Sequence, residues 1–168
     1  KGHVKLMTPF FPLEELRSVP GMENSRYEDP YAGGKGNSIR YLALAPRDDQ
    51  LKVEGVDNLF CAGEKAGLLV GHTEAMSTGA LAGHNAVRWA LGKKPVTLSR
   101  ATAVGDAIAW VREQMQTPEG LSKKYTYSGS VLFERMKAQG TYTTDVAAIQ
   151  RRIEENGLKD IFARKVIS

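Results

Sequence analysis

The stretch that decides the fold runs Asn58-Leu-Phe-Cys-Ala-Gly-Glu-Lys-Ala-Gly-Leu-Leu-Val-Gly-His-Thr-Glu-Ala75. Its first part, residues 58–62, is a short apolar run that stops at Gly63. A short apolar run bounded by glycine is typical of a buried strand. We therefore predict that a strand delivers Gly63 to the edge of a sheet.

A helix is predicted directly after this stretch, from Thr73 to Leu91. Thr73 is expected to be its N-cap, and Glu74 would lie in the first turn, where the helix dipole favours a carboxylate. Gly92 and Pro95 then mark the end of the helix. The segment therefore predicts a strand, a glycine-containing loop and a helix start in succession.

This arrangement suits the binding of a flat, electron-rich ligand. Glycines at a strand exit, here Gly63 and Gly71, let a ligand approach the backbone closely because no side chain stands between them. A helix N-terminus offers unpaired N–H groups and a partial positive charge. A flavin needs donors for its pyrimidine-side oxygens and positive potential where charge collects on reduction, so the segment predicts a flavin contact.

The predicted helix also carries a stripe of small residues at three- and four-residue spacing: Ala75, Gly79, Ala82, Gly83, Ala86 and Ala90. Glycine inside a helix costs about 1 kcal/mol relative to alanine. Gly79 and Gly83 therefore call for close packing, either against a sheet or against a flat cofactor. A helix packed tightly on a strand, as in any α/β protein, would show the same spacing.

The rest of the chain is predicted to be irregular up to residue 38 and mainly helical after residue 99. The remaining predicted elements are a helical turn at 12–17, strands at 39–45 and 51–53, and helices at 100–115 (capped by Ser99), 131–139, 145–156 and 158–166, with a break at 118–120.

Composition is that of a globular chain, with 42% hydrophobic and 25% charged residues and a net charge of +4. No apolar run is long enough for a transmembrane helix. Cys61 is the only cysteine, which excludes an internal disulfide and favours a cytoplasmic location. We expect no metal site, because the three histidines are scattered. The chain does not begin with methionine, so we expect it to be a piece of a longer protein.

The motifs Asn58-Leu-Phe-Cys-Ala-Gly63, Gly71-His-Thr-Glu-Ala75 and Ala82-Gly-His-Asn-Ala86 resemble the C-terminal flavin motif of the GidA (MnmG) and TrmFO family. The segment Leu91-Gly-Lys-Lys-Pro-Val, followed by Arg100-Ala-Thr-Ala-Val-Gly105, is more similar to TrmFO. Members of the family are FAD-dependent tRNA-uridine modifiers, so the resemblance implies FAD, with tRNA as a further partner.

On this resemblance the expected cofactor-binding residues are Gly63, Glu64, Gly71, His72, Thr73, Glu74 and Ala75; no catalytic residue is assigned. Two of them depart from the family pattern, since Glu64 replaces a glutamine and His72 a tyrosine. The Gly-x-Gly-x-x-Gly turn that holds the ADP half of FAD is absent, because Gly34-Lys-Gly36 lacks the third glycine and follows no strand. We expect a missing N-terminal part of the protein to bind that half.

The predicted fold class is α/β: the C-terminal portion of a Rossmann-like FAD-binding domain (1–98), with few strands and a glycine-rich helix, followed by a helical segment (99–168). Two alternatives stay open. One is a helical interaction or RNA-docking module on a degenerate flavin fold, using the pairs Lys93-Lys94, Lys123-Lys124 and Arg151-Arg152. The other is an FAD oxidoreductase that acts on a small metabolite, which Glu64 would fit.

Overall fold

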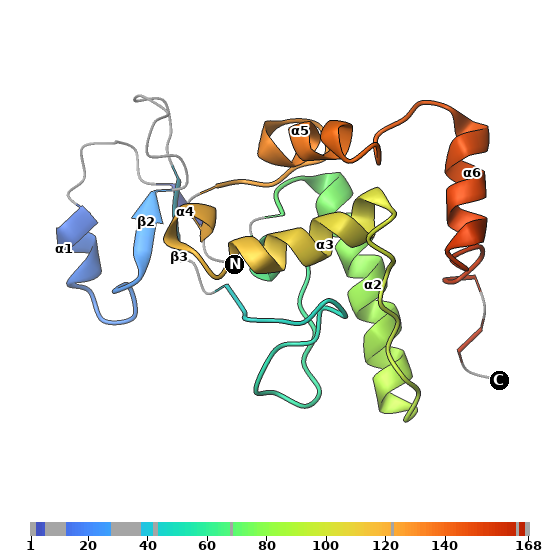
Figure 1. The fold of residues 1–168 in the computed structure, drawn as a ribbon. Coiled ribbons are helices and arrows are strands. Elements are labelled where there is room, and N and C mark those ends of the chain that lie inside the picture. Colours follow the sequence, from blue (N-terminus) through green and yellow to red (C-terminus); the bar gives the residue numbers. More distant parts are fainter. Residues whose placement is uncertain are drawn as a thin grey trace. The chain divides into compact units, whose positions relative to one another are not determined.

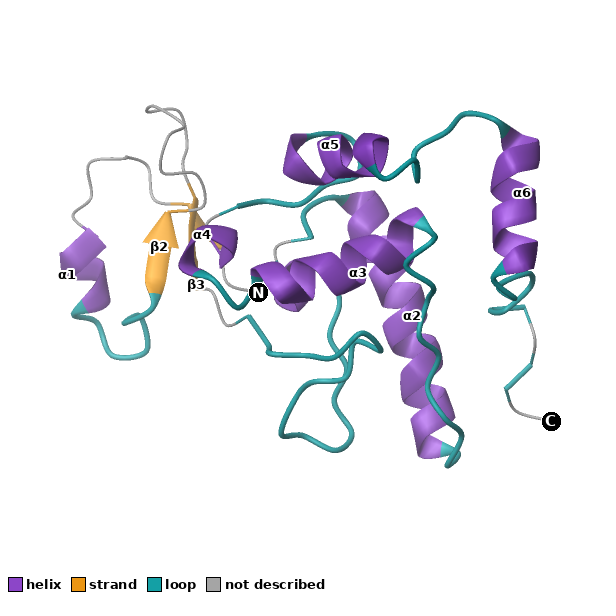
Figure 2. Ribbon diagram, in the orientation of Figure 1, coloured by secondary structure: helices purple, strands orange, loops and turns teal. Residues whose placement is uncertain are grey.

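The computed structural model describes residues 3–5, 13–27, 38–41, 44–67, 69–121, 123–163 and 165–166. The chain forms two compact units, Lys1–Ala43 and Leu44–Ser168, which are considered separately. Figure 1 shows the elements in chain order, and Figure 2 shows that helices make up most of the regular structure. The predicted combination of few strands with many helices is confirmed at this level.

In the residues that the structure describes, the first unit contains three short strands and one short helix. Strands β1 (His3–Lys5), β2 (Ser25–Tyr27) and β3 (Ser38–Tyr41) form an antiparallel sheet in the order β1-β3-β2. Helix α1 (Leu13–Arg17) contacts β2 and confirms the turn predicted at 12–17. The strand predicted at 39–45 is observed as β3, and residues 44–45 are not in a strand; residues 42–43 and the run 34–36 lie outside the described residues.

The second unit is built around α2 (His72–Ala90) and α3 (Ala103–Gln114), which pack against each other (Figure 1). A single 3₁₀ turn, η1 (Gly63–Ala66), contacts α2. The members of the core cluster are Leu51, Ala66, Leu81, Ala82 and Ile108. The core therefore joins the loop that precedes α2 to both long helices.

The buried strand predicted at 58–62 is wrong. Leu59 is 49% exposed, and Phe60 forms one isolated antiparallel bridge with Lys52. The segment is held by two backbone bonds, from Val53 N–H to the Leu59 carbonyl (2.8 Å) and from Cys61 N–H to the Leu51 carbonyl (2.9 Å). A strand is buried only where neighbours cover its edges and faces, and in the described part of the chain the pairing is limited to this contact with residues 51–53. The strand predicted at 51–53 is likewise reduced to isolated bridges.

The glycines inside α2 have no packing partner among the described residues. A Cβ atom added at Gly79 or at Gly83 would meet no atom of the described chain within 4 Å. Close packing of α2 on a sheet, one of the two reasons predicted for these glycines, is therefore not the reason within this part of the chain. Contact with a cofactor stays a prediction.

The helical part after residue 99 follows the predicted order, with shifted ends. Its remaining helices are α4 (Pro118–Leu121), α5 (Ser130–Ala138) and α6 (Val146–Glu155). The break predicted at 118–120 is instead a one-turn helix, because proline suits a first helical position and the Thr117 hydroxyl accepts from Gly120 N–H (3.0 Å).

Two further predictions in this part are corrected. Helix α3 is capped by Thr102, whose hydroxyl accepts from Gly105 N–H at 3.1 Å, and not by Ser99. The helix predicted at 158–166 is a series of turns in the described residues. There Asp160 adopts a φ of +57°, which interrupts a right-handed helix.

Candidate functional site

The loop that leads into α2 is fixed by glycines at two points. Gly63 has a φ of +58°, and its N–H donates to the buried hydroxyl of Thr78 (2.8 Å). Gly67 has a φ of +120°, and a Cβ at this position would lie 2.6 Å from Cγ1 of Val111 and 2.7 Å from Sδ of Met115. The loop therefore passes close to both long helices, and its path depends on the absence of side chains.

Helix α2 starts one residue earlier than predicted, at His72, with Gly71 as the N-cap. Gly71 has φ 135° and ψ 165°, a conformation that is essentially restricted to glycine. The predicted cap, Thr73, lies within the helix and is exposed. Because glycine carries no side chain, the cap position leaves the first-turn N–H groups without the bond that a serine or threonine cap would provide.

A pocket of about 340 Å³ lies at this helix start. Its lining residues are Glu64, Leu69, Val70, Gly71, His72 and Ala75. Four of the predicted cofactor-binding residues are thus brought together: Glu64, Gly71, His72 and Ala75. Leu69 and Val70 were not predicted, although they lie between two predicted positions and complete the apolar side of the pocket.

The other three predicted residues lie beside the pocket and do not line it. Gly63 is buried, and a Cβ there would be 3.6 Å from Ala75. Thr73 is exposed on the first turn of α2. Glu74 is 2% exposed, and its carboxylate accepts from the backbone N–H of Tyr127.

Tyr127 bonds with Glu74 at the start of α2 and therefore lies next to the pocket, and no local sequence pattern predicts this position. The Tyr127 hydroxyl lies 3.3 Å from the hydroxyl of Ser77 on α2. Burial, together with the nearby Glu74 carboxylate, raises the pKa of Tyr127 above its ordinary value. The side chain is therefore neutral at physiological pH.

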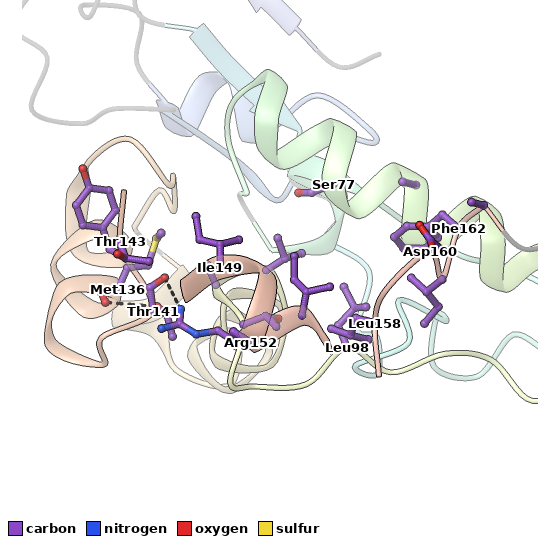
Figure 3. A pocket seen from close by; sticks show the side chains of 18 residues that line it. Ser77, Leu98, Met136, Thr141, Thr143, Ile149, Arg152, Leu158, Asp160 and Phe162 are labelled. Atoms are coloured by element: carbon purple, nitrogen blue, oxygen red, sulfur yellow. Dashed lines mark hydrogen bonds between the residues drawn. The ribbon is translucent and has the colours of Figure 1, made fainter. Parts of the chain in front are cut away.

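A second, larger pocket of about 580 Å³ is lined by residues of α2, the start of α3, α5, α6 and the turns that follow α6 (Figure 3). Its lining is mostly apolar, with Met136, Ile149, Leu158 and Phe162 among its residues. Two charged residues, Arg152 and Asp160, are in the lining; Arg152 donates to the carbonyls of Thr141 (2.9 Å) and Gly140 (2.8 Å), so this guanidinium is held by the protein. No sequence motif pointed to this pocket, because its walls come from distant segments.

Some of the remaining candidate residues are engaged within the protein. Cys61 is half-buried against the core, and burial raises the pKa of its thiol, as fits a small packing side chain. In the basic pairs, Lys123 bonds with Glu119 at 2.5 Å, and Arg152 is engaged as described above. Glu154, on the same helix as Arg152, bonds with Lys159 (2.7 Å).

Within the described residues, no group of three or more His, Cys, Asp and Glu side chains could hold a metal ion. No helix in the described part of the chain combines the length and the apolar character needed to cross a membrane.

Comparison with known proteins assigns the family. Residues 7–94 match the family model described as "Glucose inhibited division protein A" (GidA), which covers about half of the chain. The chain therefore belongs to the GidA family, and the resemblance stated from the sequence is confirmed.

Individual relatives fall into two groups. The tRNA uridine 5-carboxymethylaminomethyl modification enzyme MnmG of Acholeplasma laidlawii is 42% identical over 90 residues, which is 52% of this chain and 14% of that protein. The methylenetetrahydrofolate–tRNA-(uracil-5-)-methyltransferase TrmFO of Bacillus licheniformis is 34% identical over 100 residues, 60% of this chain and 22% of that protein. The TrmFO of Caldicellulosiruptor bescii is 31% identical over 110 residues, 66% of this chain and 24% of that protein.

The chain thus spans less than a quarter of the length of each of these relatives. No solved structure matches it.

Proposed function

We propose that this chain is the flavin-contacting portion of an FAD-dependent oxidoreductase of the tRNA-uridine-modifying GidA/TrmFO type. The observation that carries the proposal is the pocket at the start of α2, where Glu64, Gly71, His72 and Ala75 meet. The GidA and TrmFO families are FAD-dependent, and the matched residues include this pocket. In the proposed division, residues 1–98 belong to the FAD-binding domain and residues 99–168 form a helical segment.

The pocket has the properties that the end of a flavin requires. Its volume of about 340 Å³ is at the lower end of the range for small-molecule sites, so it suits one ring system and not a whole dinucleotide. Gly71 itself lines the pocket, and a Cβ there would collide with the buried Glu74 carboxylate, so the packing of Glu74 requires glycine at this position. The residues present therefore fit the group, and the ADP half is proposed to bind to polypeptide outside this chain.

Each residue has a distinct proposed role. The first-turn N–H groups of α2, at His72 and Thr73, would donate to the pyrimidine-side oxygens of the flavin. The positive end of the helix dipole would stabilise the negative charge that the ring gains on reduction. Glu64 and His72 would orient the ring from its edge, while Gly63, Glu74 and Ala75 hold the loop and the helix start in place. When bound, the cofactor supplies the redox chemistry.

The open face of α2 extends the proposed contact. Gly79 and Gly83 have no atom of the described chain within 4 Å of an added Cβ. Because glycine weakens a helix, a ligand or further polypeptide that approaches this face would explain both residues. We propose that the flavin side of the complete protein covers this face.

The proposed substrate is a uridine of tRNA. Both groups of relatives carry tRNA in their names, one as a tRNA uridine 5-carboxymethylaminomethyl modification enzyme and the other as a tRNA-(uracil-5-)-methyltransferase. An FAD oxidoreductase that acts on a small metabolite would have the same flavin pocket. Incubation of the full-length protein with unmodified tRNA, followed by nucleoside analysis, separates these two substrates.

The test of flavin binding uses the full-length protein. We expect it to purify yellow, or to take up added FAD with the absorption bands of a bound flavin. Gly79→Leu should remove the flavin while the fold is kept, because no described atom occupies the space and leucine favours helix more than glycine. Ala147→Leu, at an exposed position of α6, is the matched control and should keep the flavin. A colourless protein that takes up no FAD would refute the proposal.

A further inference from the structure

A segment from the helical part of the chain, residues 123–129, runs beside the loop that lines the flavin pocket. Val70 N–H donates to the Tyr125 carbonyl at 3.0 Å, and Leu69 and Tyr125 form a parallel bridge. Two residues further on, Tyr127 N–H donates to the carboxylate of Glu74. The segment is therefore bonded both to the pocket loop and to the first turn of α2.

Glu74 is the link between the two. Its side chain is almost fully buried, and a buried carboxylate is costly unless hydrogen bonds satisfy it. A Cβ at Gly71 would collide with Oε2 of Glu74, so the carboxylate lies directly against the backbone of the N-cap. One carboxylate thus bonds the Tyr127 backbone and packs against Gly71, and it fixes the distance between them.

The far side of segment 123–129 is itself anchored. Tyr125 is 1% exposed, its hydroxyl donates to the Gly120 carbonyl at 2.8 Å, and its ring packs edge-on against Trp110 at 5.5 Å. The Ser130 hydroxyl, at the start of α5, donates to the Lys124 carbonyl at 3.1 Å. The segment is therefore held by α3, α4 and α5, and a displacement of these helices would reach the pocket loop through it.

We propose that Glu74 and segment 123–129 are positioning elements for the flavin, which set the placement of the Gly71 and His72 backbone against the ring. This inference rests on the proposed function. It assigns a role to segment 123–129, which lies beyond the part of the chain matched by the family model, 7–94, and neither this segment nor Glu74 lines the pocket. The helical segment is then required for tight flavin binding without touching the flavin.

The test compares two variants of Glu74 with a matched control in the full-length protein. Glu74→Ala leaves the Tyr127 N–H without its acceptor and leaves empty space where the carboxylate packs against the Gly71 backbone. We therefore expect the dissociation constant for FAD to rise about 10-fold or more. Glu74→Gln keeps an oxygen acceptor of the same shape and should stay within about threefold of wild type. Asn85→Ala also removes a buried polar side chain, here one bonded to the carbonyls of Gln50 and Val96 at 2.9 and 2.8 Å and not to segment 123–129, and should lower stability while FAD affinity is unchanged.

Three results would overturn the proposal. If Glu74→Ala lowers stability but binds FAD as wild type does, Glu74 has only a structural role. If Glu74→Gln binds FAD as weakly as Glu74→Ala, the charge acts on the ring and the bond to Tyr127 does not position it. If the Tyr127 amide of the wild-type protein exchanges hydrogen as fast as an exposed amide, the link itself does not exist.

The exchange measurement needs neither a variant nor bound flavin. It therefore tests the link even if Glu74→Ala fails to fold. It also separates the two proposals, because a protected Tyr127 amide in a protein that takes up no FAD refutes the proposed function and leaves the link in place.

Discussion

The substitution Gly71→Ala should destabilise the protein strongly, while Gly79→Ala on the same helix should stabilise it. Gly71 has φ 135° and ψ 165°, where a residue with a side chain is strained by about 1–3 kcal/mol. The new Cβ would also push against the Glu74 carboxylate, whose hydrogen bond to Tyr127 N–H is worth about 1.5–3 kcal/mol as a bond to a charged group. The two effects together predict a loss of about 3 kcal/mol or more in the free energy of unfolding.

Gly79 differs from Gly71 in both its backbone conformation and its surroundings. It lies in the middle of α2, and an added Cβ would meet no described atom within 4 Å. Alanine at an unobstructed helical position is favoured over glycine by up to about 1 kcal/mol. Gly79→Ala should therefore raise the free energy of unfolding by about 0.5–1 kcal/mol.

Urea unfolding followed by far-ultraviolet circular dichroism measures both changes under one set of conditions. The slope of the transition should be the same for all three proteins, so that the midpoints report stability alone. An ordinary surface substitution changes the free energy of unfolding by about 0.5 kcal/mol or less. If Gly71→Ala stays within that range of wild type, residue 71 does not have the glycine-restricted conformation that the structure gives it. A loss of stability in Gly79→Ala would show that α2 packs against something at this position within the chain.

Three further predictions concern other parts of the second unit. Asn85→Ala should lower the free energy of unfolding in urea by about 3 kcal/mol. The buried amide bonds the Gln50 carbonyl (2.9 Å) and both the carbonyl and the N–H of Val96 (2.8 and 2.7 Å). A loss below about 1 kcal/mol would contradict this prediction. Thr102→Ala should lower the free energy of unfolding by about 1 kcal/mol because the N-cap of α3 is lost, whereas Thr102→Ser should retain most of that stability. Equal stability of the two variants would show that the cap bond does not stabilise the helix. Burial lowers the pKa of His84, with a smaller contribution from Arg88, so the unfolded state binds the proton at a higher pH than the native state. The free energy of unfolding should then fall as pH drops through about 6.5 and level off below the lowered native pKa. In His84→Gln this part of the pH dependence should be absent. An identical fall in both proteins would show that His84 does not cause it.

Local patterns predicted the helices well. The predicted helix 73–91 is α2 (His72–Ala90), 131–139 is α5 (Ser130–Ala138), and 145–156 is α6 (Val146–Glu155). Caps, stop signals and apolar spacing act within a few residues of one another, so they can be read along the chain. The exact caps were less certain, since Ser99 and Thr102 are both good N-cap residues and only the backbone geometry selects Thr102.

The sequence by itself determined the family and the short stretch in which the candidate site lies. The motifs between residues 58 and 86 pointed to the GidA and TrmFO family, and four of the seven predicted residues line one pocket. These properties depend on residue identity and local order, which are fully present in the sequence.

Only the tertiary structure decided which of these residues face the pocket and what holds them there. The run 58–62 looked like a buried strand, but burial depends on partners from elsewhere in the chain, and the described partner is limited to residues 51–53. Glu74 looked like a residue that faces the ligand, but its carboxylate turns inward to Tyr127, 53 positions away in the chain. A contact between residues so far apart leaves no local pattern, because it forms only once α2 and segment 123–129 are brought together by folding.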